Sequence, residues 1–148
     1  MSFFKDFIKV KNPTQTVFTF SELNNQVSGY SGTKLKSALK YIVQKKDLYR
    51  ISKGIYATSP DYSRQEFANK FVSPSYISLY TVLSENGIVF QPYPSIYLVS
   101  DRSKEIVIAD QKYIYRKIKD SMLLNPLGIN KIGNVHKATT ERAICDLL

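Results

Sequence analysis

The residues with the clearest potential for chemistry are the lysines between positions 33 and 46. Lys34, Lys36 and Lys40 alternate with apolar residues that recur at the spacing of one helix face. These apolar residues are Leu35, Ala38, Leu39, Ile42 and Val43. The pattern predicts an α-helix with one side packed on a core and the other side basic. Lysine ammonium groups neutralise phosphates, and neighbouring hydroxyls and amides hydrogen-bond phosphates or base edges.

The positive charge of the chain is concentrated in its first part. The 148 residues carry a formal net charge of +9. Residues 1–60 hold ten basic and three acidic residues, a net of +7, whereas residues 61–148 hold eleven and nine, a net of +2. A polyanion is the natural partner of such a basic part, with nucleic acid ahead of a membrane surface. Composition leaves open the alternative of a solvated, lysine-rich helix with no polyanion partner.

The segments around the basic helix predict a small N-terminal domain. Before it we expect a helix, a short strand and a second helix, over residues 3–10, 16–20 and 22–27. Ser21 is the expected N-cap of the second helix. After it we expect two short strands, 48–52 and 55–58, joined at Lys53-Gly54, where glycine suits a tight turn. This order of elements over residues 1–58 is that of a winged helix-turn-helix.

The second helix of a helix-turn-helix enters the major groove of B-DNA. Its first turn enters most deeply, so base contacts are expected from Thr33, Lys34, Lys36 and Ser37. Two basic residues of the hairpin are expected over the flanking backbone or minor groove. The complete predicted DNA-binding set is Ser31, Thr33, Lys34, Lys36, Ser37, Lys40, Tyr41, Arg50 and Lys53.

The rest of the chain predicts a connector and a second, mixed α/β domain, so the fold class is α+β. The connector spans residues 59–72, contains Ser59-Pro60-Asp61 and is expected to be helical over 64–71. In the domain 73–148 we expect a helix from Ser73-Pro74 to about Asn86 and a last helix capped by Thr139 or Thr140. β-like runs lie between them, at 88–90, 96–99, 105–108 and 112–118. The last helix reaches Leu148 without a capping signal, and we expect the chain to be a fragment of something longer.

The sequence supports an enzymatic or metal-binding function less strongly than DNA binding. Pro60-Asp61 and Asp110-Gln111-Lys112 spell the motif of a metal-dependent PD-(D/E)xK nuclease, but the aspartates fall in an expected connector and an expected turn. His136 and Cys145 form a conceivable nucleophilic pair, yet Cys145 is expected on the inner side of the last helix as a core residue. The chain lacks the several Cys and His ligands of a zinc site and has no phosphate-binding loop. We therefore expect no enzyme activity and no cofactor.

The location of the protein can also be inferred from composition. No apolar run approaches the ~18 residues that a membrane span requires, and the N-terminus lacks the features of a signal peptide. The single cysteine cannot form an internal disulfide. These features indicate a cytoplasmic protein without a membrane partner.

An ordered set of motifs resembles the AbiEi family, the antitoxins and transcriptional regulators of type IV abortive-infection toxin–antitoxin systems. The run from Leu48 to Ala57 is similar to that family's L-x-R-(I/L)-x-(R/K)-G-(L/I/V)-Y wing. Further similarities follow in order, in the segments 75–83, 86–88, 111–118 and 138–148, the last of which resembles A-(T/S)-x-E-(K/R)-A-(L/I)-x-D-L-(L/I). The resemblance spans the chain from about Phe18 to Leu148.

The resemblance implies a repressor that binds operator repeats in its own promoter through the winged helix. It also implies that the second domain counters a nucleotidyltransferase toxin, without a stable complex between the two proteins. The toxin's own signature, Gly-Ser followed by spaced aspartates, is absent from the sequence. A winged-helix module that binds proteins and not DNA is the alternative function, with the nuclease as a third.

Overall fold

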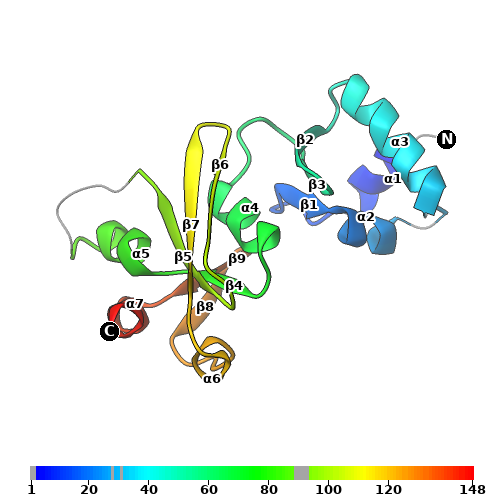
Figure 1. Cartoon of the computed structure of the whole chain (residues 1–148). Helices are drawn as coiled ribbons and strands as arrows, with labels where there is room; N and C mark the ends of the chain where they lie inside the picture. The colour runs from blue at the N-terminus through cyan, green and yellow to red at the C-terminus, as the bar shows by residue number, and fades with distance from the viewer. Residues whose placement is uncertain (1–2, 28, 31, 89–93) are drawn as a thin grey trace. The chain divides into compact units, whose positions relative to one another are not determined.

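The computed structural model describes residues 3–27, 29–30, 32–88 and 94–148 (Figure 1). Within these residues the fold is mixed, with seven helices and two sheets, which confirms the α+β part of the expected fold class. The chain divides into two compact units, Met1–Ser63 and Arg64–Leu148, called unit 1 and unit 2 below. The candidate DNA-binding residue Ser31 and most of the strand expected at 88–90 lie outside the described residues. None of the described helices is long and apolar enough to cross a membrane.

Unit 1 combines three helices with a small antiparallel sheet. Its elements are α1 (Phe3–Val10), β1 (Val17–Thr19), α2 (Phe20–Gln26), α3 (Gly32–Gln44), β2 (Tyr49–Ser52) and β3 (Ile55–Ala57), with the strand order β1-β3-β2. The cap expected at Ser21 is wrong, because Thr19 is the N-cap of α2. Thr19 Oγ1 accepts a hydrogen bond from the Glu22 amide at 3.2 Å, and Glu22 Oε1 accepts one from the Thr19 amide at 3.0 Å. Such a reciprocal capping box requires Glu or Gln three residues after the cap, and Ser21 has Asn24 there.

An aromatic core holds unit 1 together. Phe7 of α1 is fully buried and meets the ring of Phe18 edge-on, with the ring centroids 4.9 Å apart. The apolar face predicted for the basic helix is confirmed, since Leu35, Leu39 and Ile42 are buried in the same cluster. Packing of α3 on this core therefore determines which of its side chains remain exposed.

Unit 2 is built on one six-stranded mixed sheet in the order β6-β7-β5-β4-β9-β8. Its strands are β4 (Ser75–Ile77), β5 (Ile96–Ser100), β6 (Lys104–Ile108), β7 (Gln111–Lys117), β8 (Ile129–Ile132) and β9 (Val135–Ala138). Its helices are α4 (Arg64–Phe71), α5 (Leu79–Glu85), α6 (Asp120–Leu123) and α7 (Thr140–Leu147). The strands expected at 96–99, 105–108 and 112–118 are confirmed, as is Thr139 as the cap of the last helix.

The helix α4 belongs to unit 2, whereas the sequence places residues 64–71 in a connector. Phe67 is fully buried and meets the ring of Tyr113 on β7 at a centroid distance of 5.3 Å. The Tyr115 hydroxyl donates a hydrogen bond of 2.6 Å to the carbonyl of Ala68. α4 thus covers the face of the sheet on which Tyr113 and Tyr115 lie.

The helix expected over residues 73–86 is wrong in its first half. Residues 75–77 form β4, which pairs with β5 and β9 inside the sheet, and the helix begins only at Leu79. Tyr76 and Ile77 are both buried, because the strand is covered on both sides. A short apolar run of this kind does not alternate, so periodicity alone cannot distinguish it from a helix.

Phe7→Ala should lower the free energy of unfolding of unit 1 by about 3–5 kcal/mol, because it removes a fully buried ring from the core. Ile8→Ala is the matched control on the same helix, since Ile8 is 45% exposed, and it should cost far less. Native-state hydrogen exchange of the Leu35 and Leu39 amides reports on this unit separately from the other. Equal exchange rates in the two variants would contradict the central position of Phe7.

Candidate nucleic-acid interface

The outer face of α3 presents a continuous set of cationic and hydroxyl side chains. All of its predicted contact residues are exposed, namely Thr33, Lys34, Lys36, Ser37, Lys40 and Tyr41. Tyr41 is the most prominent aromatic of this face, with 60% of its surface exposed. The sequence of α3 contains no acidic residue. The helix therefore separates an apolar inner side from a basic outer side.

Aromatic rings position two lysines of this region. Lys34 Nζ lies 4.8 Å from the centroid of the Tyr30 ring, and that ring packs edge-on against Phe3 at 5.0 Å. Lys45 Nζ lies 5.2 Å from the centroid of the Tyr41 ring. A cation–π contact orients the ammonium group without neutralising its charge. Lys34 therefore remains able to bind an anion while its position is restricted.

The hairpin β2–β3 adds two exposed cations, Arg50 and Lys53, to the same unit. Its turn depends on Gly54, whose φ of 75° is in the left-handed region that favours glycine. The carbonyl of Gly54 accepts a 2.8 Å hydrogen bond from the amide of Phe20, which ties the tip of the hairpin to the start of α2. Lys53 is thus held at a fixed turn and not on a free loop.

The predicted DNA-binding set leaves out Tyr30 and Lys45, which contact two of its members in the structure. Both belong to pairs of a tyrosine and a lysine four residues apart, Tyr30 with Lys34 and Tyr41 with Lys45. Side chains at this spacing are neighbours on a helix surface, as Tyr41 and Lys45 are at the end of α3. For this pair the i, i+4 spacing was a signal available in the sequence, whereas Tyr30 precedes α3 and the rule does not apply to it.

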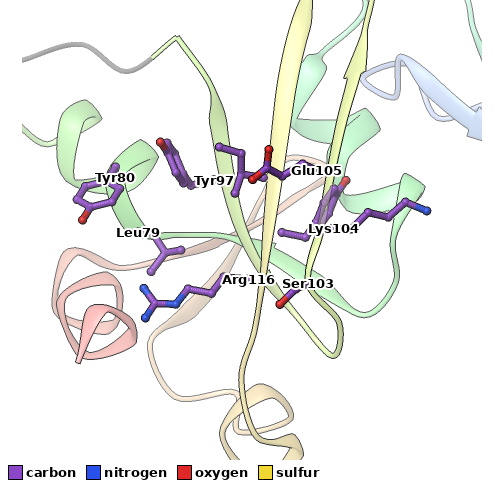
Figure 2. A pocket seen from close by; sticks show the side chains of 9 residues that line it. Leu79, Tyr80, Tyr97, Ser103, Lys104, Glu105 and Arg116 are labelled. Atoms are coloured by element: carbon purple, nitrogen blue, oxygen red, sulfur yellow. The ribbon is translucent and has the colours of Figure 1, made fainter.

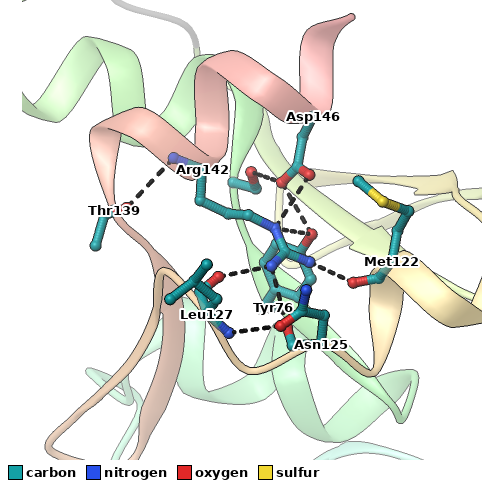
Figure 3. A network of polar contacts seen from close by, with 8 residues as sticks. Tyr76, Met122, Asn125, Leu127, Thr139, Arg142 and Asp146 are labelled. Atoms are coloured by element: carbon teal, nitrogen blue, oxygen red, sulfur yellow. Dashed lines mark hydrogen bonds and ion pairs between the residues drawn. The ribbon is translucent and has the colours of Figure 1, made fainter.

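A second polar cluster lies buried in unit 2, around the carboxylate of Asp146 (Figure 3). Asp146 Oδ2 accepts hydrogen bonds from the Tyr76 hydroxyl at 2.9 Å and from the Ser78 hydroxyl at 2.7 Å. Its Oδ1 lies 3.4 Å from Nε of Arg142, one helical turn earlier on α7. Helix α7 is thereby joined to β4 and to the residue before α5.

The guanidinium of Arg142 continues this network into the segment between α6 and β8. It donates to the carbonyl oxygens of Asn125 at 3.0 Å and Leu127 at 2.7 Å, and also to that of Met122. Figure 3 shows these carbonyls converging on the arginine head group. The cluster is a buried, hydrogen-bonded ion pair, which is the arrangement of a structural element.

The same network explains why α7 buries an unexpected face. Its buried residues are Arg142, Ala143 and Asp146, and Cys145 is exposed. The expectation that Cys145 is a core residue is therefore wrong, because the polar pair occupies the inner side of the helix. His136 is also exposed, on β9.

The predicted nuclease residues fall in turns of different units. Asp61 belongs to unit 1 and Asp110 to the β6–β7 turn of unit 2. Lys112, the motif's lysine, pairs with Glu105 at 3.2 Å. Among the described residues, no three His, Cys, Asp or Glu side chains are grouped so that they could hold a metal ion.

No protein-family model matches this chain, and no curated protein matches it.

The stability of unit 2 should decline at alkaline pH through its buried tyrosines. Burial and the adjacent Asp146 raise the pKa of Tyr76, and burial raises the pKa of Tyr115, both well above the usual range. The unfolded chain loses these protons first, so the stabilisation is complete below pH about 10 and is lost as the pH rises further.

Urea unfolding measured across this pH range tests the effect. Tyr76→Phe should flatten the alkaline decline, while Tyr41→Phe, on the exposed face of α3, should leave it as in the wild type. A decline that is equally steep in the wild type and in Tyr76→Phe would contradict the role of the buried phenol.

Proposed function

We propose that this protein binds double-stranded DNA through α3 and the β2–β3 hairpin and acts as a transcriptional repressor. The observation that carries the proposal is the exposed face of α3, which is rich in lysine and hydroxyl groups and lacks any carboxylate. The element order α1-β1-α2-α3-β2-β3, with the sheet order β1-β3-β2, supports a winged helix-turn-helix in unit 1. In such a domain α3 is the recognition helix and the hairpin is the wing.

The side chains divide into two kinds of contact. In the proposed complex, Thr33, Lys34, Lys36 and Ser37 on the first turns of α3 reach base edges in the major groove. Lys34, Lys36 and Lys40 also neutralise phosphates, and Tyr41 binds one. The wing residues, Arg50 and Lys53, lie over the flanking backbone or minor groove. Both kinds of contact use side chains that are exposed in unit 1.

The biological setting follows from the resemblance of the sequence to AbiEi antitoxins. In this proposal the protein binds operator repeats upstream of its own gene in the cytoplasm and represses a toxin–antitoxin operon. Unit 2 then carries the activity that counters a nucleotidyltransferase toxin. The motifs in 75–83 and 138–148 contain the four residues of the buried network, Tyr76, Ser78, Arg142 and Asp146. This supports a role of those motifs in the fold of unit 2.

Fluorescence anisotropy with DNA from upstream of the gene tests this proposal across a series of salt concentrations. Lys34→Glu combined with Lys40→Glu should weaken binding roughly a hundredfold and reduce the slope of log K against log salt by about two. Lys5→Glu combined with Lys9→Glu is the matched control, because it changes the charge of unit 1 equally on α1 and not on α3.

The outcomes separate the alternatives. Equal affinities and salt slopes for the two double variants would show that α3 is not the binding surface. No binding at low salt, together with a stable protein partner, would indicate a protein-interaction module instead. Divalent-metal-dependent cleavage of the DNA, lost in Asp110→Ala, would indicate the nuclease.

A further inference from the structure

Unit 2 contains a pocket of about 470 Å³ that the DNA-binding proposal does not use (Figure 2). It is lined by Leu79, Tyr80, Tyr97, Ser103, Lys104, Glu105, Ile114, Tyr115 and Arg116. This volume is within the ordinary range for pockets that bind small molecules, about 300–1,000 Å³.

The floor of the pocket is one face of the sheet. In the strand register, Tyr97 on β5 pairs with Ile114 on β7, which pairs with Glu105 on β6. Arg116 follows two residues after Ile114 and therefore shares its face. The opposite face carries Tyr113, which packs against α4. The pocket thus lies mainly on the side of the sheet that α4 does not cover, while two of its lining residues, Lys104 and Tyr115, contact α4 on the other face.

Two tyrosines and a leucine form its wall. The rings of Tyr80 and Tyr97 meet edge-on with their centroids 5.2 Å apart, and both side chains are half-buried. Leu79 is buried with a φ of 58°, a left-handed conformation that is uncommon for a residue other than glycine. Such conformations cluster at ligand sites, where the surrounding structure maintains them. The wall therefore offers partly exposed aromatic surface on a rigid frame.

Two cations of the pocket, Lys104 and Arg116, make no ion pair within the described parts of the chain. The carboxylate of Glu105 pairs with Lys112 at 3.2 Å, so it does not repel an anion strongly. Lys104 Nζ lies 5.3 Å from the ring centroid of Phe71, and in Figure 2 it points away from Arg116. Arg116 is exposed, and its guanidinium is the group that could bind an anion here.

We propose that this pocket binds a small molecule with a planar ring and one anionic group, of the size of a nucleoside monophosphate. The ring packs against Tyr80, Tyr97 and the apolar side chain of Ile114, as aromatic rings do in ligand pockets. The phosphate binds the guanidinium of Arg116, whose planar donors match phosphate oxygens. The pocket contains no residue of α3, so this proposal does not depend on whether unit 1 binds DNA.

The test is a titration of the full chain with the four common ribonucleoside monophosphates, followed by amide NMR. At least one should bind with a dissociation constant below about 1 mM, more tightly than its nucleoside or inorganic phosphate alone. The shifted amides should include Tyr97, Ile114 and Arg116. Arg116→Gln should weaken binding about tenfold, to the affinity of the nucleoside.

Matched variants identify the contributing groups. Lys117→Gln removes the same charge from the next residue of β7, which faces the other side of the sheet, and should leave binding unchanged. Tyr97→Phe should retain binding, because it keeps the aromatic ring. Tyr97→Leu should lose the preference for the nucleoside monophosphate over inorganic phosphate. No binding by any of the four, equal binding of inorganic phosphate, or shifts confined to α3 would each overturn the proposal.

Discussion

Burial of one side of α3 is the constraint on which the functional surface of unit 1 depends. Leu35, Leu39 and Ile42 pack into a cluster with the phenylalanines of α1 and β1. A helix held in this way cannot rotate without exposing those side chains to water, at a cost of about 1.5–3 kcal/mol for each one. The orientation of the lysines is therefore a consequence of the core, and no contact among the lysines is needed to maintain it.

Unit 2 depends on a different kind of interaction. Arg142 and Asp146 are buried charges, and such a pair is tolerated only when further hydrogen bonds satisfy both groups. Here the remaining partners come from β4, from Ser78 and from the carbonyls that follow α6. One ion pair thus connects α7 with β4, with Ser78 and with the segment that follows α6.

The elements that could be predicted are those with local signals. The 3.6-residue period of α3 and the glycine turn of the β2–β3 hairpin are both visible within about fifteen residues of sequence. The strand β4 was missed because its residues are buried on both sides and do not alternate. The Arg142 network was missed because it joins Tyr76 to Asp146 across 70 residues. Pairing over such a distance leaves no periodic trace in the sequence.

The pocket of unit 2 was missed for a related reason, since the strand register brings Tyr97, Glu105 and Arg116 to one face. Individually, each is an ordinary residue of a strand or strand end. Their combination depends on the parallel pairing of β5 with β7, which a single sequence does not reveal.

Phe3 of α1 contacts Tyr30, and Tyr30 contacts Lys34, so α1 helps to position a lysine on the outer face of α3. A basic side chain on α3 is supported through an aromatic ring by a residue near the beginning of the chain. A truncation that removes Phe3 would therefore alter the surface of α3 without changing the sequence of that helix. Preparations with and without Phe3 are not equivalent for measuring what this helix binds.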